Sequence, residues 1–132
     1  DWIADHMRRY LDMNGADVHL WHRVPTLLLT TTRRRSGVPQ TLPLIYGRDG
    51  AHYVVVASKG GADQHPLWYL NLVAQPQVQV QVAADCFAAR ARTASATERP
   101  ALWSLMAKLW PAYDGYQRKT SRTIPVVVLE RV

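Results

Sequence analysis

The stretch "QVQVQVAADCFAARARTA", residues 77–94, identifies a protein built mainly from β-strands. Three valines alternate strictly with three glutamines from Gln77 to Val82. Successive side chains of a strand point to opposite faces, so this pattern predicts one buried and one solvated face. The chain then returns through Cys86 and reaches Ala94. We therefore expect residues 77–94 to form an antiparallel hairpin.

Further strand-like runs lie on both sides of this hairpin. They are rich in β-branched and apolar residues and cover residues 25–32, 40–47, 52–58 and 124–131. Asp49-Gly50, between two of these runs, is a strong hairpin signal. Six or so strands joined by antiparallel turns predict a small, partly closed β-barrel, a mainly β fold with flanking helices (α+β).

Three segments have helical patterns. Residues 1–11 carry apolar side chains at helical spacing, and residues 66–75 begin with Pro66. Thr97 is expected to cap a third helix that starts at Glu98 and ends before Pro111. We expect one domain over residues 1–132, with residues 1–24 as an N-terminal helical segment.

Composition sets limits on the function. The chain has 132 residues, of which 48% are hydrophobic, enough for a real core. Its net charge of +6 favours anionic partners without choosing among a phosphate-bearing cofactor, nucleic acid and a membrane surface. The single cysteine, Cys86, cannot form an internal disulfide and is interpreted as a small packed residue in a cytoplasmic protein. No apolar run approaches the roughly 18 residues of a membrane span.

Three consecutive arginines, residues 33–35, follow the strand-like run 25–32 and precede Ser36-Gly37. Such a turn can direct several backbone N–H groups at one anion, and guanidinium groups add paired donors suited to phosphate and carboxylate. Three interpretations stay open at this point. The turn is a solvated hairpin tip, a nucleic-acid contact or a socket for a small polyanion.

Two further segments have the composition of a binding site. "VASKGGADQHPLWYLNL", residues 56–72, has adjacent glycines that permit a close approach of backbone to ligand, followed by the start of a helix. "LWPAYDGYQRKT", residues 109–120, has three aromatic residues spaced by three among polar ones. Core packing is the simpler interpretation of these aromatic side chains, and the wall of a pocket is the alternative.

Other site classes have little support in the sequence. His19 and His22 have a spacing that metal sites can use, but no further ligand motif accompanies them, so no metal is expected. The glycine motifs of dinucleotide and nucleotide folds are absent. Ser58 lacks the G-x-S-x-G context of a hydrolase nucleophile.

Three blocks occur in the order "LLLTTTRRRSGVPQTLPL", "YVVVASKGGADQHPLWYLNL" and "PAYDGYQRKTSRTIPVVVLE". Together they resemble the deazaflavin-dependent nitroreductase family of actinobacteria, from about Leu27 to the C-terminus. The resemblance implies a split β-barrel of the FMN-binding type that binds coenzyme F420. It also implies hydride transfer from reduced F420 to a conjugated acceptor such as a quinone, a nitroimidazole or an unsaturated lactone or enone.

The resemblance also implies roles for individual residues. The phosphate and glutamyl tail of F420 would be held by Arg34, Arg35, Ser36, Gly37 and Pro39. The deazaflavin ring would lie along Ala57, Ser58, Lys59 and Gly60, above a helix that supplies Trp68 and Asn71. Tyr113 and Tyr116 match aromatics that close over the ring and shape the acceptor pocket. Ser58 and the two tyrosines are then the candidate donors to the acceptor oxygen, where negative charge develops.

Three positions depart from the family pattern. Arg33 replaces a usual glycine, and Gln40 replaces a common arginine whose charge Arg33 can partly restore. Trp110 stands where a tyrosine can occur, which leaves the identity of the acceptor open. Two other functions also remain. An FMN-dependent split-barrel oxidoreductase could use the same arginine turn, and a small nucleic-acid-binding barrel ranks last because the charges concentrate at one turn.

The expected partner is a small-molecule hydride acceptor, with no nucleic acid and with a monomer favoured. The N-terminal segment has two alternative roles. It is expected to pack on the barrel as an amphipathic helix, whereas in relatives a segment here can cover the acceptor pocket or touch the membrane. The expected location is the cytoplasm, with peripheral contact to the inner face of the cell membrane as the alternative that such a helix allows.

Overall fold

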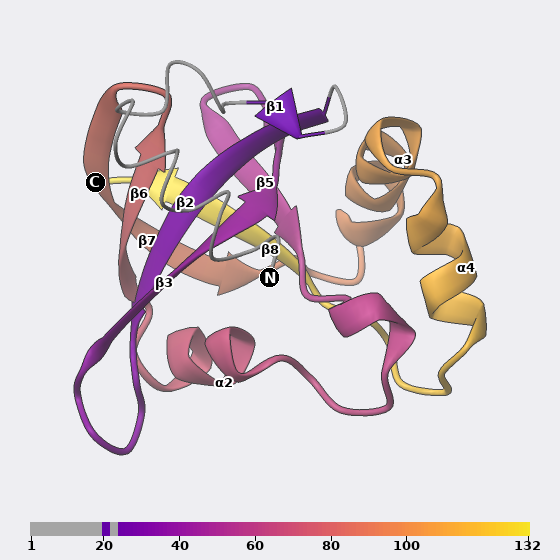
Figure 1. Ribbon diagram of the computed structural model, residues 1–132. Helices are drawn as coiled ribbons and strands as arrows, with labels where there is room; N and C mark the ends of the chain where they lie inside the picture. The colour runs from indigo at the N-terminus through magenta and orange to yellow at the C-terminus, as the bar shows by residue number, and fades with distance from the viewer. Residues whose placement is uncertain (1–19, 22–23) are drawn as a thin grey trace.

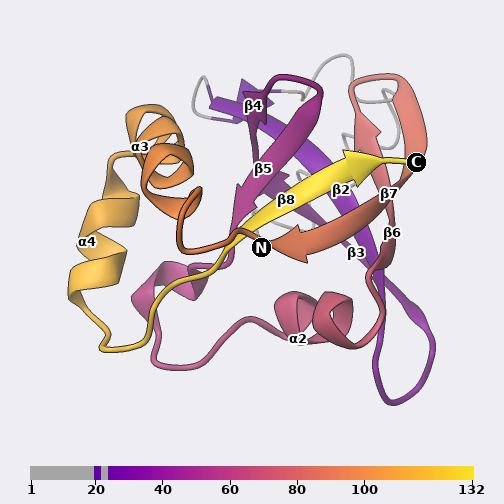
Figure 2. The same ribbon diagram turned by 180° about the vertical axis from the view of Figure 1, so that it is seen from behind.

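The computed structural model describes residues 20–21 and 24–132. Its strands are β1 (Leu20–Trp21), β2 (Val24–Thr32), β3 (Pro39–Ile45), β4 (Gly47–Asp49), β5 (His52–Val56), β6 (Gln77–Val82), β7 (Asp85–Thr93) and β8 (Val126–Arg131). Its helices are the 3₁₀ turn η1 (Lys59–Gly61), α2 (Leu67–Ala74), α3 (Arg99–Leu109) and α4 (Ala112–Arg118). Helix α2 lies across the lower end of the strands, and α3 and α4 lie together on one side (Figure 1). Figure 2 shows the same arrangement from behind.

The strands form an antiparallel sheet in the order β3-β2-β6-β7-β8-β5-β4, with β1 added to the start of β2. The curved sheet brings β3 close to β5. No ladder joins these two strands within the described part of the chain. The barrel is therefore open along one seam, between β3 and β5, which confirms the partly closed barrel expected from the strand pattern and the split β-barrel that the family resemblance implies.

Hydrophobic packing forms two cores on opposite faces of the same strands. Side chains of Tyr53 and Val55 point into the barrel, whereas Val54 and Val56 pack under α3 and α4. Strand β8 repeats this division, so its valines are buried on both faces. Such strands have continuous apolar runs, because neither face meets water. Helices α3 and α4 are thereby held against the outside of the barrel, next to the open seam.

The hairpin predicted for residues 77–94 is confirmed as β6 and β7. Val78 and Val80 are buried in the barrel, and Gln77 and Gln79 are exposed. The interpretation of Cys86 as a packed residue is wrong, because this thiol is exposed. The alternation along β7 turns Phe87, Ala89 and Ala91 inward, so Cys86 lies on the outer face.

The cap expected at Thr97 is also wrong. Helix α3 begins at Arg99, and the turn before it is closed by Ser95. The Glu98 N–H donates to Ser95 Oγ at 3.2 Å, and the Ser95 N–H donates to Glu98 Oε1 at 2.8 Å. This reciprocal pair is a capping box, which needs serine or threonine three residues before glutamate. Ser95 has that spacing and Thr97 does not.

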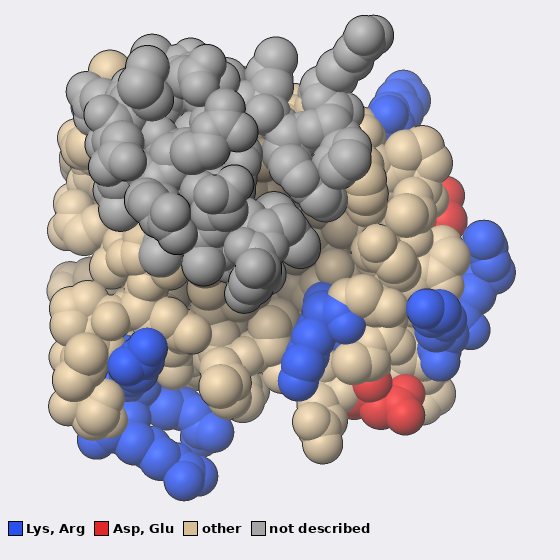
Figure 3. Space-filling model, in the orientation of Figure 1, with Lys and Arg blue, Asp and Glu red and all other residues tan. Residues whose placement is uncertain are grey.

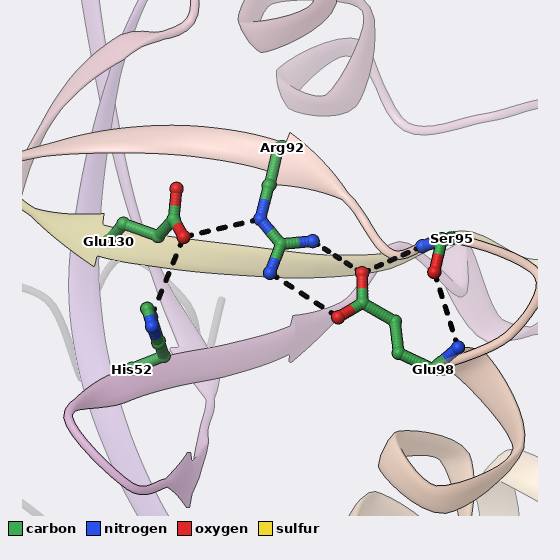
Figure 4. Close-up of polar contacts among 5 residues, drawn as sticks. All are labelled: His52, Arg92, Ser95, Glu98 and Glu130. Atoms are coloured by element: carbon green, nitrogen blue, oxygen red, sulfur yellow. Dashed lines mark hydrogen bonds and ion pairs between the residues drawn. The ribbon is translucent and has the colours of Figure 1, made fainter.

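Glu98 also ties α3 to the sheet. Figure 4 shows Arg92 of β7 lying between two carboxylates, those of Glu98 and of Glu130 on β8. His52 of β5 faces Glu130, with 3.8 Å between His52 Nδ1 and Glu130 Oε2. The hydrogen bond from Arg92 lowers the pKa of Glu98, and the Ser95 N–H adds to the effect.

This shift predicts how stability depends on pH. A carboxyl group whose pKa is lowered by folding stabilises the fold above its ordinary pKa of 4.5 and loses that contribution as pH falls through its folded pKa. We expect Glu98→Gln to be less stable than wild type in urea unfolding at neutral pH. The difference should shrink as pH falls below 4.5 and through the folded pKa of Glu98, because the wild-type carboxyl then becomes protonated as well. A difference that stays constant over this range would contradict the assignment.

The N-terminal expectation is partly corrected. Residues 20, 21 and 24 were assigned to a helical segment, but Leu20 pairs with Pro25 and Trp21 pairs with Val24 in an antiparallel ladder. The helix expected over residues 1–11 and the residues His19 and His22 lie outside the described residues. In the part of the chain that the structure describes, no helix combines the length and the apolar character required to cross a membrane.

Candidate functional site

A cavity of about 570 Å³ lies at the open seam of the barrel. Strand β3 forms one wall with residues 41–45, and Val56 at the end of β5 faces it. The remaining lining comes from Thr26, Gln40, Ser58, Lys59, Gly60, Pro66, Trp68, Trp110, Tyr113 and Tyr116. The cavity thus has mainly apolar walls and a few polar groups, which is the usual composition of a site for a small organic ligand or cofactor.

The polar edge of this cavity is the turn η1. Lys59, Gly60 and Gly61 have φ angles of 47°, 63° and 84°. Three consecutive residues in the left-handed region fold the chain back tightly after β5, and the two glycines do so with little steric cost. Ser58 stands at the start of this turn without a side-chain capping bond, so its hydroxyl is available to a ligand in the cavity.

Arg122 fixes the segment that contains this turn. Its guanidinium group donates to the carbonyl oxygens of Ala57 at 3.3 Å, Ser58 at 2.7 Å and Ala62 at 2.7 Å. It also contacts His65 Nδ1 at 2.9 Å. Because arginine only donates, His65 Nδ1 must accept and the imidazole is neutral in this contact. Burial lowers the pKa of His65, and the charge of Arg122 lowers it further.

The turn η1 also supports α4. A Cβ atom on Gly61 would lie 2.6 Å from the carbonyl oxygen of Tyr116 and 2.9 Å from its Cα, whereas a Cβ on Gly60 would meet nothing within 4 Å. Asp63 accepts a hydrogen bond of 2.9 Å from Thr120, just after α4. The polar edge of the cavity and the helix that carries its tyrosines are therefore packed as one unit.

This packing predicts different costs for two adjacent glycine substitutions. Both sites have positive φ, which costs an alanine about 1–2 kcal/mol. Only Gly61→Ala also overlaps backbone, so we expect it to lower the free energy of unfolding by about 2–5 kcal/mol in total. Gly60→Ala is the matched control. Equal losses for the two variants in urea unfolding would show that η1 and α4 do not support each other.

Aromatic side chains form the wall opposite β3. Tyr113 is 5% exposed, and its ring meets that of Tyr116 edge-on with 6.0 Å between centroids. Trp110 Nε1 donates to the Tyr116 hydroxyl at 3.4 Å. Burial raises the pKa of Tyr113, and the neighbouring Tyr116 adds to this effect. Tyr113 therefore remains a protonated phenol over the whole physiological range.

A second cavity of about 450 Å³ lies beside the first, at the tip of the β2–β3 hairpin. Its lining comprises Arg33, Arg34, Arg35, Ser36, Gln40, Leu67 and Asn71. Basic side chains gather at this tip, at the lower left of Figure 3. Three adjacent guanidinium groups facing a concave surface are suited to a small ligand with several negative charges.

The backbone of this turn offers less to an anion than the sequence suggests. The N–H groups of Arg33 and Gly37 donate within the turn, to Val38 O and Arg33 O. The Arg34 N–H donates to Asn71 Oδ1 at 3.2 Å. Ser36 Oγ accepts from the Val38 N–H at 3.2 Å, so its own proton remains available. The N–H groups of Arg33, Arg34, Gly37 and Val38 are therefore already bonded within the protein.

The structure divides the site residues expected from the sequence into three groups. Six line the larger cavity, namely Ser58, Lys59, Gly60, Trp68, Tyr113 and Tyr116. Four line the smaller cavity, namely Arg34, Arg35, Ser36 and Asn71. Three line neither and shape the backbone around the cavities, namely Gly37, Pro39 and Ala57. Helix α2 thus serves both cavities, since Trp68 faces one and Asn71 the other.

Sequence reasoning assigned no role to several residues of the site. Gln40, noted from the sequence only as a departure from the family pattern, lines both cavities, and Leu67 lines the smaller one. The apolar wall of β3 and the bonds of Arg122 were also missed. Arg122 gave a usable signal, because an arginine just before a buried apolar strand needs partners for its charge.

Comparison with known proteins gives consistent results. The family model described as F420H(2)-dependent quinone reductase matches residues 2–131. An F420H(2)-dependent quinone reductase of Mycobacterium tuberculosis is 39% identical over 129 residues, which cover 89% of this chain and 83% of that protein. The solved structure of an F420-H2 dependent reductase, FDR-A, superposes with a TM-score of 0.75 at 40% identity and covers 80% of this chain and 94% of its own.

A second solved structure bears on the oligomeric state. It is 37% identical, has a TM-score of 0.77, covers 98% of both chains and is described as a domain-swapped dimer. The monomer expected from the sequence therefore has no support from this relative.

Proposed function

The chain belongs to the F420H(2)-dependent quinone reductase family, and from this premise we propose that its two adjoining cavities hold reduced F420 during reduction of a quinone. The deazaflavin ring would occupy the larger cavity, and the phosphate and glutamyl tail would lie among Arg33, Arg34 and Arg35. The observation that supports this placement is that the two cavities adjoin. An apolar cavity and an arginine-lined cavity share the residue Gln40, as a ligand with a flat ring and a polyanionic tail requires.

The residues of each cavity fit the chemistry of its part of the ligand. The wall from β3 and the side chain of Trp68 provide flat apolar surface for a ring. Arginine donors pair with phosphate and carboxylate oxygens. F420 supplies the hydride when it is bound in its reduced form. The protein contributes placement and electrostatic stabilisation.

Two side chains would donate to the acceptor, and a third would cover the ring. A quinone that receives hydride develops negative charge on its oxygen, and a positioned donor stabilises that charge. The Ser58 hydroxyl at the polar edge and the Tyr116 hydroxyl at the aromatic wall both line the cavity and would donate to this oxygen. Tyr113, kept protonated by its burial, would cover the ring and keep water from it. The final proton can come from water through the open side of the cavity.

Ligand binding tests the proposal against its alternatives. The protein is titrated separately with F420, FMN and a single-stranded oligonucleotide, with tryptophan fluorescence as the readout. We expect F420 to bind with micromolar affinity or better and the other two to bind much more weakly. Tighter binding of FMN would favour a flavin oxidoreductase. Tight binding of the oligonucleotide that weakens steeply with salt would favour the nucleic-acid function.

A further inference from the structure

We propose that Gln40 is a cofactor-binding residue whose side-chain NH2 group donates to the linker between the ring and the anionic tail, in an orientation set by Asn71. The inference rests on the proposed function of the two cavities. It concerns the stretch of the ligand between the ring and the glutamyl tail, at the point where the two cavities meet. The acceptor atoms in the linker would be the oxygen atoms of a hydroxylated chain or of a phosphodiester.

The position of Gln40 is the first observation. It lies near the start of β3, paired with Thr31 of β2, and its side chain is only partly buried. Of the residues that line the two cavities, Gln40 is the one that lines both. A ligand that occupies both cavities must pass this side chain.

The hydrogen bonds around Asn71 are the second observation. A backbone N–H can only donate, so the side-chain atom of Asn71 that meets the Arg34 N–H at 3.2 Å is the oxygen. The other atom of the amide is therefore the nitrogen, which donates to Thr31 Oγ1 at 3.2 Å and to Gln40 at 3.0 Å. Asn71 is 4% exposed, so this orientation is enclosed by protein.

The orientation of Gln40 follows from its neighbour. Because Asn71 donates to it, the Gln40 atom that faces Asn71 is the oxygen Oε1. Its Nε2 then points elsewhere and makes no hydrogen bond to the described part of the chain. A donor with two protons is thus presented where the cavities join. It carries no charge, so it suits hydroxyl and phosphodiester oxygens that lie between the ring and the arginines.

The test compares Gln40→Met, which keeps the length and removes the donor, with Gln40→Glu, which keeps the shape and replaces the donor by a carboxylate. Binding is measured for F420 and for the deazaflavin with its hydroxylated chain but without phosphate and tail. Gln79→Met on the exposed face of β6 is the matched control. We expect Gln40→Met to weaken F420 binding about tenfold and Gln40→Glu to weaken it more, since it adds repulsion.

The two ligands locate the contact. Loss with both would place the donor at the hydroxylated chain, and loss with F420 alone would place it at the phosphodiester. Either result supports the inference. Unchanged affinity of Gln40→Met for both ligands would overturn it, provided that wild type binds F420. Failure of wild type to bind F420 would instead overturn the proposed function.

A second variant tests the orienting role of Asn71. In Asn71→Asp the side chain can still accept from the Arg34 N–H, but it can no longer donate to Gln40. The Gln40 amide should then rotate, so that its nitrogen donates to residue 71 and its oxygen faces the point where the two cavities meet. We expect Gln40→Met to cause no further loss of F420 affinity in this background. A full additional tenfold loss would show that Asn71 does not orient Gln40. If Asn71→Asp does not fold, the two Gln40 variants alone decide the inference.

Discussion

Replacing both Arg34 and Arg35 by alanine is expected to weaken F420 binding by about a hundredfold or more and to leave the fold intact. Charge-assisted hydrogen bonds to a partly desolvated anion contribute about 1.5–3 kcal/mol each, so each single variant should lose roughly tenfold or more. Both side chains are exposed and form no ion pair with the described part of the chain, so we expect their removal to leave the fold intact. Equilibrium fluorescence titration measures the loss.

Two controls separate this effect from a general effect of charge. Arg90→Ala removes an exposed arginine from β7, away from both cavities, and should leave the affinity unchanged. Wild-type binding should weaken as salt is added, and the double variant should depend on salt less steeply. Affinity equal to wild type in the double variant would show that the anionic tail of F420 does not bind at the arginine turn.

Replacing Ser58 by alanine is expected to lower kcat for quinone reduction by about 10²–10³ with nearly unchanged F420 affinity. This is the usual cost of removing one positioned donor beside a developing negative charge. The backbone at Ser58 should not move, because its carbonyl oxygen remains bonded to Arg122 and to the Gly61 N–H. Steady-state kinetics with a soluble quinone, combined with F420 titration, measure the two quantities separately.

Ser104→Ala provides the matched control for this substitution. Ser104 lies on the exposed face of α3, outside both cavities, and its hydroxyl has no role in the proposal. If Ser58→Ala reduces quinone at the wild-type rate, then Ser58 has only a structural role. Stabilisation of the acceptor oxygen would then fall to Tyr116 or to water.

The parts of the fold that could be predicted from the sequence depend on local patterns. Strict alternation identifies β6, and Asp49-Gly50 identifies the turn between β4 and β5. The two-sided burial of β5 and β8 matches their continuous valine runs. The short strand β1 could not be predicted, because two residues of strand carry no periodic signal.

The site was harder to predict, because its residues meet only through the tertiary fold. The seam between β3 and β5 follows from the strand order, which no single segment encodes. Trp68 and Asn71 lie on one short helix, yet the path of the β2–β3 hairpin brings Asn71 to the arginines and leaves Trp68 at the larger cavity. Arg122 is far in sequence from the carbonyl groups that it holds.

The most direct test of the central claim is a turnover measurement. The protein is mixed with F420H2 and a soluble quinone without oxygen, and the formation of oxidised F420 and of quinol is followed. We predict protein-dependent formation of the two products in equal amounts, with slower turnover when the transferred hydrogen of F420H2 is deuterium. Tight binding of F420H2 without its oxidation by any quinone above the uncatalysed rate would contradict the account.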